Sequence, residues 1–266
     1  MSRVRVDDLR KGGTAAGPLV AVTAYDYAFA RLADQAGADI LLVGDSLGMV
    51  VQGEATTLPV TLDQMVYHSQ CVSRGRERAL MVADLPFRAY KASPAQALDS
   101  AARLMAEGGV EMVKLEGGGP MVDTVAFLHQ RDIPVMGHLG LTPQSVHQLG
   151  GYRVQGRDAE VADQLVEDAV GLERAGARAL VLESVPRALA ARVTEAVGIP
   201  VIGIGAGPQC DGQVLVLHDL LGLDERARPR FARRYMDGAG QVTEALGAFC
   251  RDVRIGAFPD DDHSFD

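Results

Sequence analysis

Four short apolar runs in this chain each end in an acidic residue, at Asp45, Asp84, Glu116 and Glu183. Runs this short and this uniformly apolar are typical of strands that are buried on both faces, as in parallel sheets. A carboxylate at the end of a buried strand is costly unless it is paired, hydrogen-bonded or bound to a metal. Because four runs share this feature, the pattern predicts one common acidic site.

Strand-like and helix-like segments alternate along the chain. Eight segments have the apolar character of strands, and segments with helical periodicity lie between most of them. The segment 93–109 shows the expected helix ends, since Ser93 and Pro94 favour a start and Gly109 favours a stop. The expected strands are LVAVTAY, DILLVGD, ALMVADL, VEMVKLE, PVMGHLG, ARALVLE, PVIGIGA and QVLVLHD.

This alternation indicates an α/β protein with parallel strands and crossover helices. Eight such units in 266 residues match the size of one (β/α)8 TIM barrel, with a doubly wound open sheet as the alternative. No linker or low-complexity segment divides the chain, so we expect residues 1–266 to form a single barrel domain. In a barrel, catalytic groups lie at the carboxyl ends of the strands, which is where all four acids fall.

Two consecutive units of the chain resemble each other, MVKLEGG…DIPVMGHLG and LVLESVP…GIPVIGIGAG. Glu116 aligns with Glu183, whereas Lys114 and His138 align with apolar residues. Because the second unit has apolar side chains at these two positions, folding does not require a lysine or a histidine there. Lys114 and His138 therefore indicate a role beyond folding. Lys114 and Glu116 are two residues apart on one strand, so we expect both to point to the same face.

Composition and charge narrow the class of protein. The chain is 47% hydrophobic, enough for a sizeable core, and its net charge of -9 argues against a nucleic-acid binder. Cys71, Cys210 and Cys250 are far apart, which argues against disulfides or a thiolate zinc site. The start of the chain has no apolar signal region, and no run approaches the ~20 residues of a membrane helix. We therefore expect a cytoplasmic protein that binds neither nucleic acid nor membrane.

The acids suggest a hard cation. Asp45, Asp84 and Glu116 supply oxygen ligands of the kind Mg²⁺ takes, and a Cys/His cluster for zinc is absent. Each aspartate taken singly could instead cap the loop that follows its strand. Glu183 could also be a loop cap, although a half-buried glutamate with a raised pKa is the usual form of a general base.

Lys114 and His138 each have two interpretations. A lysine inside an apolar strand is rarely structural, so Lys114 either forms an internal salt bridge with Glu116 or also binds an anionic substrate. His138 is either a core histidine with satisfied hydrogen bonds or a residue of the site.

Long motifs extend across nearly the whole chain. They are TAYDYAFA, LLVGDSLGMVVQG, TLPVTLDQMVYH, ADLPF, VKLEGG, GHLGLTPQSV, GGYRVQGR, VIGIGAG and the terminal HSF. Together they resemble the motifs of the ketopantoate hydroxymethyltransferase family. This resemblance implies a (β/α)8 barrel of the phosphoenolpyruvate mutase/isocitrate lyase-like type. It also implies transfer of a one-carbon unit from 5,10-methylenetetrahydrofolate to 3-methyl-2-oxobutanoate, which gives 2-dehydropantoate (ketopantoate) in pantothenate biosynthesis.

The resemblance further implies roles for individual residues. One Mg²⁺ per subunit would lie on Asp45, Asp84 and Glu116, and Glu183 would be the proton acceptor in a reaction through a magnesium-stabilised enolate. A homo-oligomer of decamer type is expected from the family. The residues that fall where the family binds the 2-oxo acid are Asp45, Ser46, Asp84, Lys114 and His138.

Two other functions are compatible with the same residues. One is a folate-independent, magnesium-dependent lyase or mutase that makes or breaks C–C or C–P bonds in 2-oxo acids. The other is a non-catalytic barrel that acts as an assembly scaffold. Consumption of the folate distinguishes the transferase from the lyase or mutase. Magnesium-dependent binding of the 2-oxo acid would exclude the scaffold.

Overall fold

A computed structural model of the chain describes residues 3–14, 16–224 and 229–264. Its contacts group into two units, Met1–Val216 and Leu217–Asp266. The single domain over residues 1–266 therefore stays a prediction. Phe265, the last residue of the HSF motif, lies outside the described residues.

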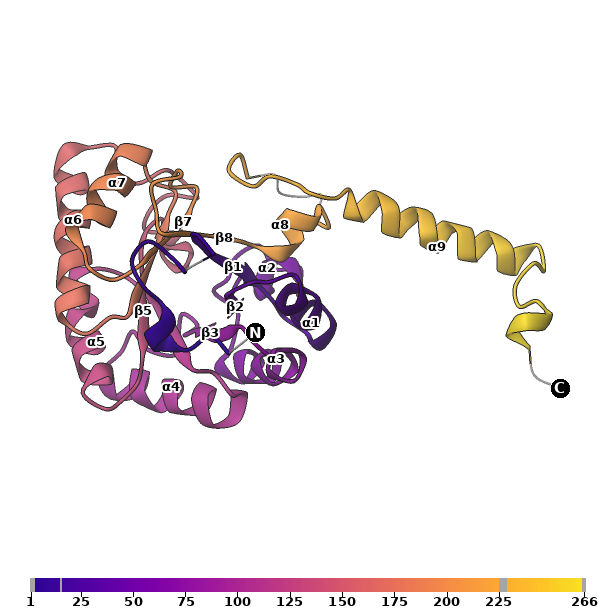
Figure 1. Ribbon diagram of the computed structural model, residues 1–266, viewed down its shortest axis with the longest axis horizontal. Helices are drawn as coiled ribbons and strands as arrows, with labels where there is room; N and C mark the ends of the chain where they lie inside the picture. The colour runs from indigo at the N-terminus through magenta and orange to yellow at the C-terminus, as the bar shows by residue number, and fades with distance from the viewer. Residues whose placement is uncertain (1–2, 15, 225–228, 265–266) are drawn as a thin grey trace. The chain divides into compact units, whose positions relative to one another are not determined.

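The first unit contains a closed barrel of eight parallel strands in sequence order (Figure 1). β1 pairs with β2 on one side and with β8 on the other, which closes the ring. The predicted barrel is thus confirmed and the open sheet is wrong. The strands are β1 Leu19–Thr23, β2 Ile40–Val43, β3 Leu80–Asp84, β4 Met112–Glu116, β5 Val135–Gly140, β6 Ala179–Glu183, β7 Val201–Ile204 and β8 Gly212–Leu215.

The observed strands are shorter than the predicted runs, and the last run also includes the start of a helix. The run QVLVLHD is extended only as far as Leu215, and α8 (Leu217–Leu221) begins two residues later. Apolar periodicity alone does not separate a short buried strand from a short buried helix, which explains the error.

Helices lie between most of the strands of the first unit. α4 begins as predicted, because the Ser93 side chain accepts a 3.2 Å hydrogen bond from the Gln96 N–H. It ends at Gly109, whose φ of 71° is a left-handed conformation that favours glycine. The helices of this unit are α1 Tyr27–Gln35, α2 Leu47–Val50, α3 Leu62–Gly75, α4 Pro94–Gly108, α5 Val122–His129, α6 Ala159–Arg174 and α7 Arg187–Ala196, with 3-10 turns at Val6–Asp8, Gly119–Met121 and Pro143–Ser145.

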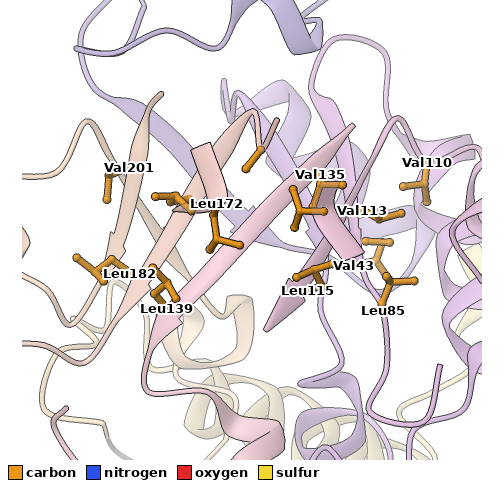
Figure 2. Close-up of a cluster of buried hydrophobic side chains, with 14 of the residues drawn as sticks. Val43, Leu85, Val110, Val113, Leu115, Val135, Leu139, Leu172, Leu182 and Val201 are labelled. Carbon is orange, nitrogen blue, oxygen red and sulfur yellow. The ribbon is translucent and has the colours of Figure 1, made fainter. Parts of the chain in front are cut away.

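The barrel has two apolar layers because successive side chains of a strand point to opposite faces. One set fills the interior, and the other packs against the helices. Figure 2 shows part of the outer set, which includes Val113, Val135 and Leu182 of the strands and Leu172 of α6. The inner set consists of Leu19, Ala21, Ile40, Leu42, Leu80, Val82, Met112, Met136, Ala179, Val181, Ile202, Ile204 and Val214, together with Val4 and Leu9.

The second unit contains α8, α9 (Gly238–Arg254) and a 3-10 turn at Asp261–His263. Several apolar side chains of α9 are exposed, among them Leu246 and Phe249. Across the described ranges, no helix combines the length and the apolar character needed to cross a membrane. The three cysteines are free thiols, as the sequence predicts.

Candidate active site

The polar site residues continue the inward-facing rows of the barrel. Met112 of β4 belongs to the interior layer, so Lys114 and Glu116 on the same strand face the interior as well. The register places Asp84 opposite Lys114 and His138 opposite Glu116. At the carboxyl end the interior therefore changes from apolar to charged.

Lys114 and Asp84 form a buried ion pair. Nζ of Lys114 lies 2.7 Å from Oδ1 of Asp84, and each side chain is 6% exposed. Oδ2 of Asp84 accepts a 3.0 Å hydrogen bond from the main-chain N–H of Asp45. Burial by itself lowers the pKa of Lys114, but Asp84 and the neighbouring acids outweigh this and raise it above its usual value. The ammonium therefore stays charged.

The sequence suggested Glu116 as the salt-bridge partner of Lys114, and the structure gives Asp84 instead. Residues two apart on one strand are separated by roughly 7 Å, since a strand rises about 3.4 Å per residue. Asp84 lies directly across from Lys114 on the neighbouring strand, which brings the two charges into contact.

Asp45 and Glu116 are buried acids that resist ionisation. Burial and the nearby Asp84 charge raise the pKa of Asp45 to about 7, although Lys114 and Gln144 oppose the shift. Burial and the Asp45 charge raise the pKa of Glu116 well above its usual range. Three carboxylates thus share one ammonium, and an added positive charge would stabilise their ionised forms.

His138 lies between Lys114 and Glu183. Its Nδ1 is 3.2 Å from Nζ of Lys114, and its Nε2 is 3.2 Å from Oε2 of Glu183, although the second contact is not aligned as a hydrogen bond. Burial and the Lys114 charge hold the pKa of His138 well below its usual range, so the ring is neutral.

Glu183 stands apart from the other acids. Its side chain is 15% exposed, more than those of Asp84 and His138. Burial raises the pKa of Glu183 to about 7, the Lys114 charge opposes the shift, and the Asp84 charge adds to it. A carboxyl group with this pKa exchanges its proton readily near neutral pH.

Ser46 is the least engaged of the predicted residues. It precedes α2 directly, but its side chain does not cap that helix. Its hydroxyl lies 2.8 Å from the hydroxyl of Tyr25. Its predicted contact with substrate stays a prediction.

Sequence reasoning missed two buried residues of the site, Gln144 and Tyr90. Gln144 lies in the turn Pro143–Ser145 after β5 and hydrogen-bonds to both Asp45 and Glu116. Tyr90 lies in the segment between β3 and α4 and hydrogen-bonds to Gln144. Neither belongs to a periodic element. The only sequence indication for Gln144 is its place inside the GHLGLTPQSV motif.

The chemistry of these residues fits a magnesium ion. The donors are carboxylate oxygens, and Oδ1 of Asp84 is buried with no aligned hydrogen bond despite its ion pair. Among the residues that the structure describes, no three His, Cys, Asp or Glu side chains form a ready-made metal cage. Magnesium commonly takes one or two carboxylates and keeps several waters, so Asp45 and Asp84 would be the residues to hold it.

Comparison with known proteins identifies the family of the chain. A sequence model of the family described as ketopantoate hydroxymethyltransferase matches residues 3–261. The chain is 54% identical to the 3-methyl-2-oxobutanoate hydroxymethyltransferase of Magnetococcus marinus over 99% of this chain and 98% of that protein. It is 58% identical to the enzyme of the same name from Thiobacillus denitrificans, over 93% and 94% of the two chains.

Solved structures share the fold at low identity. Phosphoenolpyruvate phosphomutase from Streptomyces platensis subsp. rosaceus aligns with a TM-score of 0.63 and 15% identity, covering 94% of this chain and 88% of that one. A phosphonopyruvate hydrolase in complex with oxalate and Mg²⁺ aligns with a TM-score of 0.60 and 15% identity, over 94% and 89%. The barrel therefore has the same fold as these proteins, and the chain belongs to the ketopantoate hydroxymethyltransferase family of transferases.

Proposed function

We propose that this protein transfers a one-carbon unit from 5,10-methylenetetrahydrofolate to 3-methyl-2-oxobutanoate, giving 2-dehydropantoate for pantothenate biosynthesis. The observation that carries the proposal is the division of the buried charges. Lys114 is ion-paired with Asp84, and the charges of Asp45 and Glu116 also act on it. Glu183 lies on the far side of a neutral His138. The first group suits binding of an anionic keto acid with a cation, and the second suits removal of a proton.

The substrate would bind through its two oxygen-bearing groups. Lys114 is a buried cation that stays charged, so it can neutralise the carboxylate of the 2-oxo acid. Asp45 and Asp84 would hold one Mg²⁺, with Glu116 joining directly or through a water. When bound, Mg²⁺ polarises the keto group and makes the adjacent C–H bond more acidic. The barrel neighbour solved with oxalate and Mg²⁺ makes magnesium the first metal to test.

Glu183 would act as the general base. In its ionised form it takes the proton from C3 of the substrate, and its pKa near 7 suits transfer in both directions near neutral pH. Water would hydrolyse the folate methylene group, which breaks both of its C–N bonds, releases tetrahydrofolate and leaves the carbon as formaldehyde. The electron pair left on C3 then forms the new bond to that carbon, and the formaldehyde oxygen takes up a proton to become the hydroxyl group of the product. His138, held neutral, would keep the region beside Glu183 free of a competing positive charge.

Product formation from purified protein tests the proposal. The protein is mixed with 3-methyl-2-oxobutanoate, Mg²⁺ and 5,10-methylenetetrahydrofolate, and 2-dehydropantoate and tetrahydrofolate are followed by NMR and absorbance. We expect the two products in equal amounts and none without the folate. Cleavage or rearrangement of the 2-oxo acid without folate would favour the lyase or mutase. Failure to bind the 2-oxo acid with Mg²⁺ present would favour a scaffold.

Two further features belong to the same proposal. A homo-oligomer of decamer type is the expected assembly, and sedimentation velocity of the purified protein would measure it. The cytoplasm is the expected compartment, and fractionation of the source cells with an antibody against the chain would test that.

A further inference from the structure

Gln144 connects two acids that come from different strands. Its amide nitrogen donates a 2.9 Å hydrogen bond to Oδ2 of Asp45. Its main-chain N–H donates a 3.0 Å hydrogen bond to Oε2 of Glu116. The residue is 4% exposed, so water does not compete for these bonds. Both acids are therefore held by a single residue of the loop after β5.

The orientation of the Gln144 amide is fixed by its neighbours. Nε2 donates to two acceptors, the Asp45 carboxylate and the carbonyl oxygen of Leu85 at 3.0 Å. Oε1 accepts a 2.7 Å hydrogen bond from the hydroxyl of Tyr90. A rotated amide would place its oxygen against two acceptors, which disfavours that orientation strongly in a buried site.

Tyr90 is itself oriented by Glu116. The main-chain N–H of Glu116 donates to the Tyr90 hydroxyl at 3.1 Å, which leaves the hydroxyl proton for Gln144. The alternative acceptor for that proton, the Glu116 carbonyl oxygen, is farther away at 3.3 Å. A continuous chain of hydrogen bonds therefore runs from Glu116 through Tyr90 and Gln144 to Asp45. Such buried, fully satisfied chains are rigid.

We propose that Gln144 is a positioning residue of the magnesium site, with Tyr90 as its support. Its hydrogen bond fixes one oxygen of Asp45, so the other oxygen would be available to the cation, and its main-chain N–H fixes one oxygen of Glu116. This inference rests on the proposed function, because that function supplies the cation. Groups that orient metal ligands in this way commonly change metal affinity by about 10- to 100-fold when they are removed.

Calorimetric titration with Mg²⁺ tests this role without using activity. The variants are Gln144→Met, which keeps the length of the side chain and the main-chain N–H, and Tyr90→Phe, which removes only the hydroxyl. We expect the Mg²⁺ dissociation constant to rise about 10- to 100-fold in Gln144→Met and less in Tyr90→Phe. The double variant should bind like Gln144→Met, because both changes break the same chain.

A surface glutamine provides the matched control. Gln164 of α6 is exposed and donates a 3.0 Å amide hydrogen bond to Asp168, so Gln164→Met removes the same kind of bond away from the site. It should keep wild-type Mg²⁺ affinity.

Three results would count against the role of Gln144. Unchanged Mg²⁺ affinity in Gln144→Met and Tyr90→Phe would overturn it even if the melting temperature of the apo-protein fell, since a purely structural residue affects stability alone. Should Gln144→Met not fold, unchanged affinity in Tyr90→Phe would be decisive. If the wild-type protein bound no Mg²⁺, the metal assignment of the proposed function would fail first, and this inference with it.

Discussion

Nε2 of His138 lies 3.2 Å from Oε2 of Glu183, while Nδ1 of the same ring lies 3.2 Å from the Lys114 ammonium. An ammonium group only donates hydrogen bonds, so Nδ1 must be the accepting nitrogen. The ring is neutral, and its single proton is therefore on Nε2, which faces Glu183. The tautomer of His138 is thus set by Lys114, and it presents an N–H to the carboxyl group proposed as the base.

The first prediction concerns Glu183 as the base. Glu183→Gln should bind 3-methyl-2-oxobutanoate with Mg²⁺ but exchange its C3 proton with solvent about 10²- to 10⁴-fold more slowly, as expected when a general base is lost. Exchange in deuterated water, followed by proton NMR without folate, measures this step alone. Asp163→Asn, on the exposed face of α6, is a suitable control and should exchange at the wild-type rate. Wild-type exchange in Glu183→Gln would show that another group removes the proton.

The pH dependence of the same exchange is a second prediction. Burial raises the pKa of Glu183 to about 7, and only the ionised carboxylate accepts a proton. At saturating Mg²⁺ and substrate, the exchange rate should rise as pH increases toward about 7 and level off above it. The measurement is a series of initial exchange rates from pH 5 to pH 9. A rate already constant above pH 5 would contradict the raised pKa.

The predicted site residues that lie together in the structure share one physical property. Asp84, Lys114, Glu116, His138 and Glu183 all lie at or near strand ends, and period-2 alternation puts them on the face that also carries the interior apolar residues. A charged side chain on that buried face is energetically costly. A charged residue among the apolar positions of a strand can therefore be recognised from the sequence. The barrel itself was predictable for the same reason, since alternating buried strands and capped helices allow few folds.

What the sequence did not predict depends on contacts between distant segments. The pairing of Lys114 with Asp84 follows from the register of β3 and β4, which no local pattern specifies. Gln144 and Tyr90 lie in connecting segments, where a polar residue is ordinary and its burial becomes evident only in the folded chain. The charged residues at the strand ends were thus predictable from the sequence, whereas the loop residues that hydrogen-bond to them were not.

The raised pKa values also predict how stability depends on pH. Burial raises the pKa of both Asp45 and Glu183 to about 7, from values near 4 in the unfolded chain. Between about pH 4 and about pH 7, the folded apo-protein therefore binds more protons than the unfolded chain. The stability contributed by the two groups is complete below about pH 4 and is lost as pH rises through about 7.

Urea unfolding of the apo-protein at pH 5.5, 7 and 8.5 measures this trend. The contribution of these two groups should make the unfolding free energy fall over the series, and added Mg²⁺ should restore more of it at pH 8.5 than at pH 5.5. Asp45→Asn removes one of the titrating groups, so it should flatten the pH trend and reduce the effect of Mg²⁺. An identical pH trend in Asp45→Asn would exclude Asp45 as a source.

Replacing the buried ammonium is a fourth prediction. Lys114→Met leaves Asp84, Asp45 and Glu116 without their shared cation, and removing one partner of a buried ion pair typically costs about 3–5 kcal/mol. The loss should be larger at pH 8.5 than at pH 5.5, because the acids avoid the penalty by taking up protons. Urea unfolding at the two pH values checks both points.

A variant of a second lysine, Lys11, separates the effect of the buried acids from that of losing a lysine side chain. Lys11 donates 2.7 Å hydrogen bonds to the carbonyl oxygens of Thr194 and Val197. Lys11→Met should therefore destabilise the protein by a similar amount at both pH values. If Lys114→Met also lost the same stability at pH 5.5 and pH 8.5, the buried acids would not be the cause.

Gly140, at the end of β5, packs closely against the backbone of Glu183 at the end of β6. Its φ of 87° favours glycine, and a Cβ atom there would lie 2.2 Å from the carbonyl oxygen of Glu183. That oxygen also accepts a 2.8 Å hydrogen bond from the N–H of Leu141, so the two strand ends are locked together. Gly140→Ala should thus force the strand end that carries Glu183 to move.

Gly37 offers a comparison with the same backbone conformation and no crowding. Its φ is 96°, and a Cβ atom would meet no other atom within 4 Å. Gly37→Ala should cost about 1–2 kcal/mol of stability from backbone strain and keep the wild-type rate of C3 proton exchange. Gly140→Ala should cost more and also slow the exchange at least tenfold, because displacement of the base by 1 Å is enough for such a loss. Thermal unfolding and proton exchange of the two variants, measured together, test the point. Equal exchange rates in both would mean that the position of Glu183 does not depend on the close approach of Gly140.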